Sequence, residues 1–107
     1  MIFTLREGDT SPALEYTMSP ADVELGGATV RFHMVKDDGT VTIDNVSDGV
    51  TVIDETDPPK VSYQWQIGDT DARGRYEAEF RVAYGDGSVE TFPARGFIAV
   101  LIEGRTP

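Results

Sequence analysis

The sequence contains no cysteine and only one histidine, and these two shortages exclude several kinds of chemistry. Without thiols the chain can form no disulfide, no thiolate metal centre and no cysteine nucleophile. A metal site would depend on carboxylates and on His33, whose neighbours in the alternating pattern point the other way. We therefore expect His33 to face outward, as a solvated or interface side chain. No motif supplies a nucleophile for a catalytic triad, so we expect no enzyme, no bound metal and no cofactor.

Long hydrophobic runs are also missing. No apolar run approaches the ~20 residues of a membrane-spanning helix, and the N-terminus lacks the pattern of a signal peptide. The 19 acidic residues outnumber the 9 basic ones, which gives a formal net charge of −10. Such a charge opposes a broad phosphate-binding surface. We therefore expect neither a membrane nor a nucleic acid as a partner.

Lysine is scarce among the basic residues, because only Lys36 and Lys60 are lysines and the others are arginines. Two interpretations stay open. The chain is adapted to high salt, which screens the self-repulsion of a strongly charged domain, or it is an acidic domain from a genome whose codons favour arginine. The first interpretation predicts that lowering the salt concentration destabilises the domain.

The sequence does contain many short segments in which apolar and polar residues alternate. Turn residues separate them, and no segment shows sustained helical periodicity, so we expect eight or nine short strands. The predicted strands cover residues 2–6, 13–18, 29–35, 41–43, 50–53, 61–67, 74–84, 88–92 and 97–102. This pattern is typical of an antiparallel β-sandwich. We expect one domain over residues 1–103 and a short C-terminal tail over residues 104–107.

A local motif narrows this fold class. Asp71, Gly74 and Tyr76 stand at the start of the strongest predicted strand. An acidic residue, a glycine and a tyrosine at this spacing resemble the tyrosine corner of immunoglobulin-like sandwiches, where the tyrosine hydroxyl bonds back to the backbone. Ala78 occupies the position where an antibody domain would carry a cysteine. The resemblance therefore implies an immunoglobulin-like β-sandwich without the cross-sheet disulfide.

A second resemblance extends over residues 6–102. It rests on the segments 6–10 (REGDT), 25–32 (LGGATVRF), 63–65 (YQW), 68–71 (GDTD), 74–76 (GRY) and 91–93 (TFP). These segments resemble the N-terminal immunoglobulin-like domain of siphophage baseplate upper proteins and related small tailed-virus virion proteins. The resemblance implies a structural protein located in the virion, in the tail, baseplate or neck. Its partners would be other virion structural proteins and, in a symmetric assembly, further copies of itself.

Other functions remain as alternatives. One is a head-decoration or fibre-anchoring module of the same particle, and another is a surface carbohydrate-binding module. Carbohydrate sites usually expose aromatic side chains as stacking platforms, whereas the aromatic side chains of this chain fall on the apolar faces of their strands. These side chains are Tyr63, Trp65, Tyr76, Phe80 and Tyr84.

The acidic turns are candidates for calcium binding, because calcium prefers oxygen ligands. Residues 37–38 and 54–57 are the richest in carboxylates, but neither has the ligand spacing of a calcium loop. Aspartate and glycine also favour turns for conformational reasons, so we interpret both segments as turns. The segment 69–71 is interpreted in the same way, as polar side chains that cap a short turn between the two sheets.

The last predicted strand, residues 97–102, is apolar on both of its faces, whereas a strand with one face in water should alternate. Either a loop or the N-terminal segment covers its second face, or this face docks onto a neighbouring subunit. For the second case we predict the contact residues to be Ile2, Phe3, Phe97, Ile98, Val100 and Ile102.

Overall fold

The computed structural model describes residues 2–18, 25–54 and 58–105, and these form nine strands and no helix. The strands are β1 (Ile2–Arg6), β2 (Leu14–Thr17), β3 (Thr29–Lys36), β4 (Val41–Val46), β5 (Val50–Asp54), β6 (Lys60–Tyr63), β7 (Gly74–Ala83), β8 (Val89–Phe92) and β9 (Ile98–Glu103). Within the described ranges there is accordingly no helix of the length and hydrophobicity that crossing a membrane requires.

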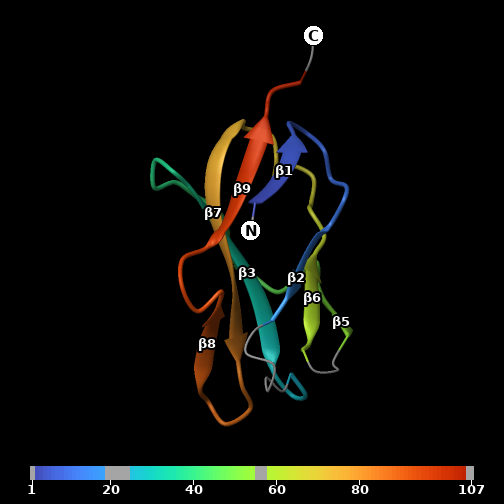
Figure 1. Ribbon diagram of the computed structural model, residues 1–107, viewed down its shortest axis with the longest axis vertical. Helices are drawn as coiled ribbons and strands as arrows, with labels where there is room; N and C mark the ends of the chain where they lie inside the picture. Colours follow the sequence, from blue (N-terminus) through green and yellow to red (C-terminus); the bar gives the residue numbers. More distant parts are fainter. Residues whose placement is uncertain (1, 19–24, 55–57, 106–107) are drawn as a thin grey trace.

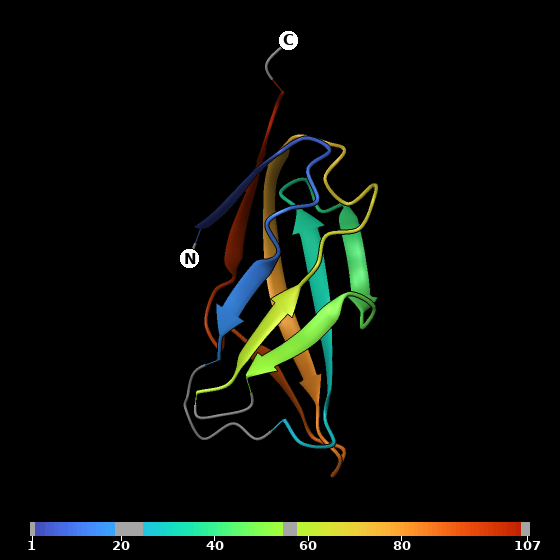
Figure 2. The ribbon, with the colours of Figure 1, turned by 90° about the vertical axis from the view of Figure 1, so that its right-hand side faces the viewer.

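The strands form two sheets that pack face to face (Figures 1 and 2). The larger sheet has the order β1-β9-β7-β3-β4, and β8 pairs with β7 beside this path. The smaller sheet has the order β2-β6-β5. All pairings are antiparallel except that of β1 with β9, which is parallel. The chain is therefore an immunoglobulin-like β-sandwich, as the sequence predicts.

The core lies between the sheets and is rich in aromatic rings. Phe32 of β3 stacks on Tyr63 of β6 at a centroid distance of 4.3 Å, and Trp65 meets both rings edge-on. Phe80 of β7 completes the cluster at 5.1 Å from Phe32. Such aromatic pairs contribute about 0.5–1.5 kcal/mol each beyond the area that they bury. The cluster explains how the two sheets are held together without a disulfide.

Most predicted strands match the observed ones to within a few residues, but the prediction for residues 61–67 is wrong at its end. Strand β6 stops at Tyr63, and the chain then turns through residues 67–70. Trp65 is still buried, whereas Ile67 is 97% exposed. The cause is a side-chain contact: the Asp69 carboxylate accepts a hydrogen bond from the Gln66 N–H at 2.8 Å, which favours a turn over a continuing strand.

Two residues of the expected tail are attached to the domain. The Arg6 guanidinium donates a hydrogen bond to the Gly104 carbonyl at 2.8 Å, and Arg105 lies 3.5 Å from a carboxylate oxygen of Asp9. These contacts tie the chain beyond β9 to the end of β1 and to the segment that follows it.

Candidate functional site

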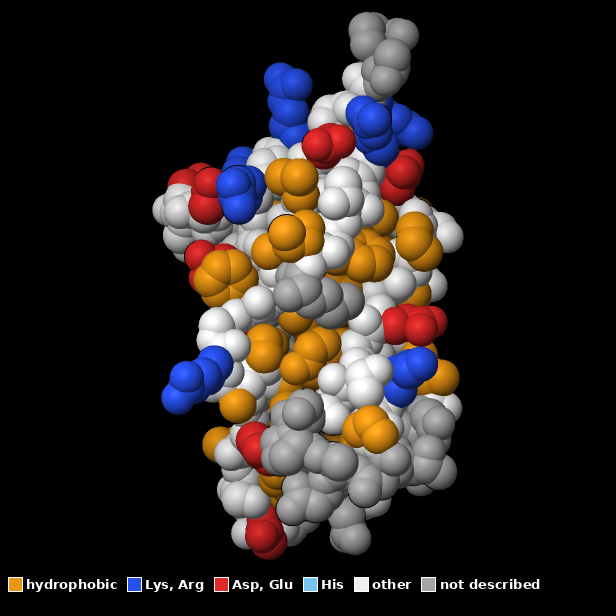
Figure 3. Space-filling model, in the orientation of Figure 1, with side chains coloured by type: hydrophobic (Ala, Val, Ile, Leu, Met, Phe, Trp, Pro, Cys, Tyr) orange, Lys and Arg blue, Asp and Glu red, His pale blue; other side chains and the backbone are white. Residues whose placement is uncertain are grey.

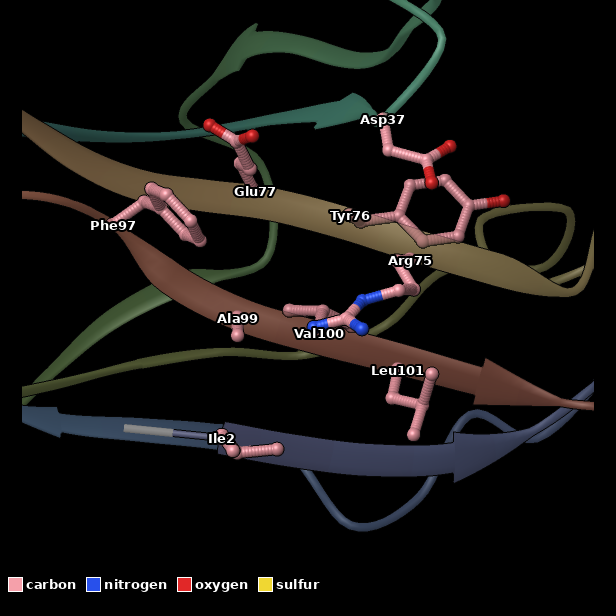
Figure 4. A pocket seen from close by; sticks show the side chains of 9 residues that line it. All are labelled: Ile2, Asp37, Arg75, Tyr76, Glu77, Phe97, Ala99, Val100 and Leu101. Carbon is pink, nitrogen blue, oxygen red and sulfur yellow. The ribbon is translucent and has the colours of Figure 1, made fainter.

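A shallow groove crosses the outer side of the larger sheet where β1, β9 and β7 lie next to one another. Figure 3 shows apolar side chains gathered over these strands. The groove has a volume of about 250 Å³, and Figure 4 shows the residues that line it. We call this surface the β1–β9 face and define it by Ile2, Asp37, Arg75, Glu77, Phe97, Ala99 and Leu101.

Strand register explains why apolar side chains meet here. Ile2 pairs with Ala99, and Ala99 pairs with Glu77 on the next strand. One step along, Leu101 pairs with Arg75. Because side chains on directly paired residues share a face of a sheet, two rows of outward side chains run across three strands. Ile2 is 74% exposed and Phe97 is 46% exposed, whereas Ala99 and Leu101 are half-buried.

The β1–β9 face carries charges of both signs beside its apolar floor. Arg75 and Glu77 project from β7, and Asp37 stands at the turn after β3, where its N–H bonds to the Arg75 carbonyl at 2.9 Å. In Figure 4 the Arg75 guanidinium extends toward β9. None of these three side chains forms an ion pair with any residue in the described part of the chain.

Strand β1 is an edge of the larger sheet, so one side of its backbone has no partner among the described strands. Natural edge strands are usually protected from pairing by prolines, bulges, or charged side chains that point inward. Between Ile2 and Leu5 the strand carries none of these devices, and its register with β9 is regular. The opposite edge, β4, has register shifts against β3 and a positive φ at Asn45. The two ends of the strand order therefore differ, and β1 is the more regular one. Strand β8, which pairs only with β7, is a further edge of this sheet.

The six predicted interface residues do not lie together on one surface. Ile98, Val100 and Ile102 are at most 1% exposed and point into the core, so the prediction that they contact a partner is corrected. Phe3 is half-buried and packs on Trp65 at a centroid distance of 6.0 Å. Only Ile2 and Phe97 lie on the exposed side, and their contact with a partner stays a prediction.

The sequence reasoning missed Arg75, Glu77, Asp37, Ala99 and Leu101 as members of this surface. The sequence does show Arg75 and Glu77 on the charged side of their strand. It does not show that this side continues into the apolar side of the last strand, because that follows from the pairing of β7 with β9.

The tyrosine-corner motif has the expected contact. The Tyr76 hydroxyl donates a hydrogen bond to the Ala72 carbonyl, four residues upstream. Gly74 is required between them, since its φ of +151° is one that other residues rarely adopt. A Cβ at this position would also lie 2.8 Å from Cε of Lys36. Burial, followed by the nearby carboxylates of Asp38, Asp37 and Glu7, raises the pKa of Tyr76. Asp71, the third member of the motif, is exposed at the turn itself.

The polar segment 69–71 serves the turn between the sheets, as expected. Asp69 accepts hydrogen bonds from the Gln66 N–H and, at 2.6 Å, from the Tyr63 hydroxyl. Thr70 is 1% exposed, and its hydroxyl donates to the Asp9 carbonyl at 2.7 Å. The Gly8 N–H in turn donates to the Thr70 carbonyl at 3.0 Å. The segment therefore fixes the loop after β6 to the loop after β1.

His33 faces outward, but it is not solvated. It lies on the outer side of β3, where its side chain is only 13% exposed. Its Nδ1 atom is buried without a hydrogen-bond partner and lies 3.7 Å from an Asp44 carboxylate oxygen. It is paired with Glu79 of β7, and alternation along a single strand reveals neither this pairing nor the contact with Asp44.

The acidic turns adopt ordinary turn geometry where they are described. Asp38 accepts a hydrogen bond from the Thr40 N–H at 2.9 Å, and Asp86 accepts one from the Ser88 N–H at 2.9 Å. The bond from Thr40 lowers the pKa of Asp38. The hydrogen bond from the Ser88 hydroxyl at 2.6 Å, followed by that from its N–H, lowers the pKa of Asp86. Residues 55–57 of the other candidate segment lie outside the described residues. Among the described residues, no three histidine, aspartate or glutamate side chains come together as metal ligands would.

Comparison with known proteins adds one finding on the fold. No family model matches the chain, and no curated protein does. Among solved structures, CopC from Methylosinus trichosporium OB3b is similar over 98% of this chain and 86% of its own, with a TM-score of 0.54 and 12% identity. At this identity the likeness establishes the β-sandwich fold alone.

This comparison corrects the expected function. The chain was expected to be a structural virion protein, with a head-decoration, fibre-anchoring or carbohydrate-binding module as alternatives. The matching structure is CopC rather than a virion protein, which points away from a viral structural role. The aromatic side chains also oppose a stacking platform, because Tyr63, Trp65, Tyr76 and Phe80 are all at most 3% exposed.

Proposed function

We propose that the chain is a non-catalytic binding module that pairs with a second copy of itself through the β1–β9 face. The observation that carries this proposal is the presence of three unpaired charges of both signs around one apolar groove. A two-fold interface brings the same patch of both copies together, so that patch has to complement itself. Arg75 of each copy would face Glu77 or Asp37 of the other.

The apolar floor supplies the favourable contact area of such a pair. Ile2 and Phe97 lose their exposed surface on association, and each Å² of apolar surface removed from water contributes roughly 25 cal/mol. Exposed ion pairs add only about 0–1 kcal/mol each. We therefore assign the affinity to the apolar residues, and the choice of partner and orientation to the three charges.

The first experiment measures the molar mass by sedimentation velocity over a range of protein concentrations. The wild type should dimerise, and Leu101→Asp should shift it to monomer by placing a carboxylate in the groove floor. Val89→Asp is the matched control, because Val89 is 78% exposed on β8 and does not line the groove. A wild type that stays monomeric at millimolar concentration would refute self-pairing.

A charge exchange tests the geometry more sharply. Arg75→Glu leaves only acidic side chains around the groove and should abolish dimerisation. Adding Glu77→Arg to this variant restores one charge of each sign on the same strand, so the double variant should dimerise again. If Arg75→Glu dimerises like the wild type, the charges do not face each other across the interface and the two-fold arrangement is wrong.

A further inference from the structure

A second pocket lies on the same side of the larger sheet, near the far ends of β3, β7 and β8. It has a volume of about 210 Å³ and is lined by Arg31, Asn45, Arg81, Val82, Ala83, Val89, Glu90 and Thr91. The polar side chains of its lining are Arg31 of β3, Asn45 of β4, Arg81 of β7, and Glu90 and Thr91 of β8. The pocket shares no residue with the β1–β9 face.

The two arginines of this pocket stand directly opposite each other. Arg31 of β3 and Arg81 of β7 are register partners, and Arg81 is in turn paired with Thr91 of β8. Directly paired side chains of antiparallel strands have Cβ atoms about 5 Å apart, and like charges at that distance destabilise the pair. Two positive charges have thus been placed together in a chain of net charge −10.

Two acids lie near these charges, and only one of them forms an ion pair with an arginine. Glu79 forms an ion pair with Nε of Arg81, which leaves the two terminal nitrogens of that guanidinium outside the pair. Glu90 pairs in register with the buried Val82, and its carboxylate accepts a hydrogen bond from the Tyr84 hydroxyl at 2.8 Å. Arg31 is half-buried and has no ion pair with a described residue. Arg31 therefore has no acid paired with it, while Glu90 keeps its negative charge in the lining of the pocket.

We propose that this pocket binds a carboxylate group between Arg31 and Arg81. A guanidinium presents its N–H groups as a planar fork that matches the two oxygens of a carboxylate. One carboxylate would give Arg31 the ion-pair partner that it lacks among the described residues, whereas a phosphate dianion would meet stronger repulsion from Glu90 and from the acidic domain. A water molecule in the liquid takes up ~30 Å³, so the pocket has room for a carboxylate with a short carbon chain. That carboxylate is either a free small acid or a glutamate side chain of a peptide.

The test is an NMR titration of the ¹⁵N-labelled protein with sodium butyrate and, separately, with N-acetyl-glutamate amide. N-acetyl-glutamine amide and sodium chloride at equal ionic strength are the controls. We expect saturable shifts of the amide signals of Arg31, Arg81 and Thr91. Equal affinity for both carboxylates supports a site for free acids, and tighter binding of the glutamate derivative supports a peptide site. Shifts that the glutamine derivative reproduces, or tighter binding of inorganic phosphate, would overturn the proposal.

Substitutions separate a binding role of Arg31 from a structural one. Arg31→Gln should weaken butyrate binding by at least about tenfold, because a hydrogen bond to a charged group is lost. Arg31→Lys keeps the charge but loses the fork, so its binding should be intermediate. Arg95→Gln removes one positive charge from an exposed position that lines neither pocket, and this variant should bind like the wild type. Without ligand, Arg31→Gln should unfold at the same or a higher denaturant concentration. A clear loss of stability would mark Arg31 as a structural cation and contradict the proposal.

Discussion

The hydroxyl of Tyr63 donates a hydrogen bond to the Asp69 carboxylate at 2.6 Å, across the turn that ends strand β6. Tyr63 itself is 1% exposed and stacks on Phe32 in the core. The same carboxylate oxygen also accepts the Gln66 N–H. One aspartate therefore connects the aromatic core to the turn at residues 67–70, which precedes β7.

Removing the Tyr63 hydroxyl should destabilise the domain. We expect Tyr63→Phe to lower the free energy of unfolding by about 1.5–3 kcal/mol, the usual contribution of a hydrogen bond to a charged group. Denaturant unfolding at pH 7 measures this loss. Tyr16→Phe is the matched control, since Tyr16 is half-buried on β2 with no hydrogen bond to an acid in the described ranges. A loss no larger in Tyr63→Phe than in the control would show that the bond to Asp69 contributes nothing.

The same contact should make the domain sensitive to alkali. Burial, and then the hydrogen bond and negative charge of Asp69, raise the pKa of Tyr63 above its ordinary value. A group whose pKa is higher in the folded state contributes its stability fully below about pH 10, and this stability is lost as the pH rises further. The unfolding free energy should thus fall above pH 10. The fall should be shallower in Tyr63→Phe, although Tyr16 and Tyr76, whose pKa values are also raised, will preserve part of it. Equal slopes in both proteins would contradict this assignment.

The tyrosine corner makes a separate contribution. Tyr76→Phe removes the hydrogen bond to the Ala72 carbonyl but leaves the buried ring in place. We expect a loss of about 0.5–1.5 kcal/mol, because both partners are neutral. Tyr63→Phe should therefore lower the free energy of unfolding by more than Tyr76→Phe does in the same assay. The reverse order would contradict our assumption that a charged acceptor makes the stronger hydrogen bond.

Alternation along the sequence predicted the strands well, because each strand has one side in the core. Strand β7 is the clearest case, with Tyr76, Ala78, Phe80 and Val82 all buried. The prediction failed at Ile67, where the Asp69 side chain competes with the strand for the Gln66 N–H. Such a contact depends on which turn forms, and the alternating pattern of apolar and polar residues does not predict the turn.

The candidate site was harder to predict than the fold. Residues 97–102 are apolar at every position, so their sequence cannot say which face is buried. The pairing of Val100 with Tyr76 shows which face is buried, because Tyr76 itself is buried and paired residues share a face. Ile98, Val100 and Ile102 then point inward, and Ala99 and Leu101 point outward. The opposition of Arg31 and Arg81 also arises only when β3 and β7 are placed side by side.

Salt concentration should change both the stability and the self-pairing of the chain. The net charge of −10 produces repulsion within each copy and between copies, and the screening length shortens from about 30 Å at 0.01 M salt to about 8 Å at 0.15 M. Raising sodium chloride from 0.01 to 0.5 M should raise the melting temperature. It should also strengthen dimerisation, since long-range repulsion between two acidic copies outweighs the few exposed ion pairs at the groove.

Arg75→Gln, with a net charge of −11, should show the same trend in melting temperature. A melting temperature that stays constant up to molar salt would contradict adaptation to high salt, and dimerisation that weakens with salt would show that the ion pairs dominate the interface.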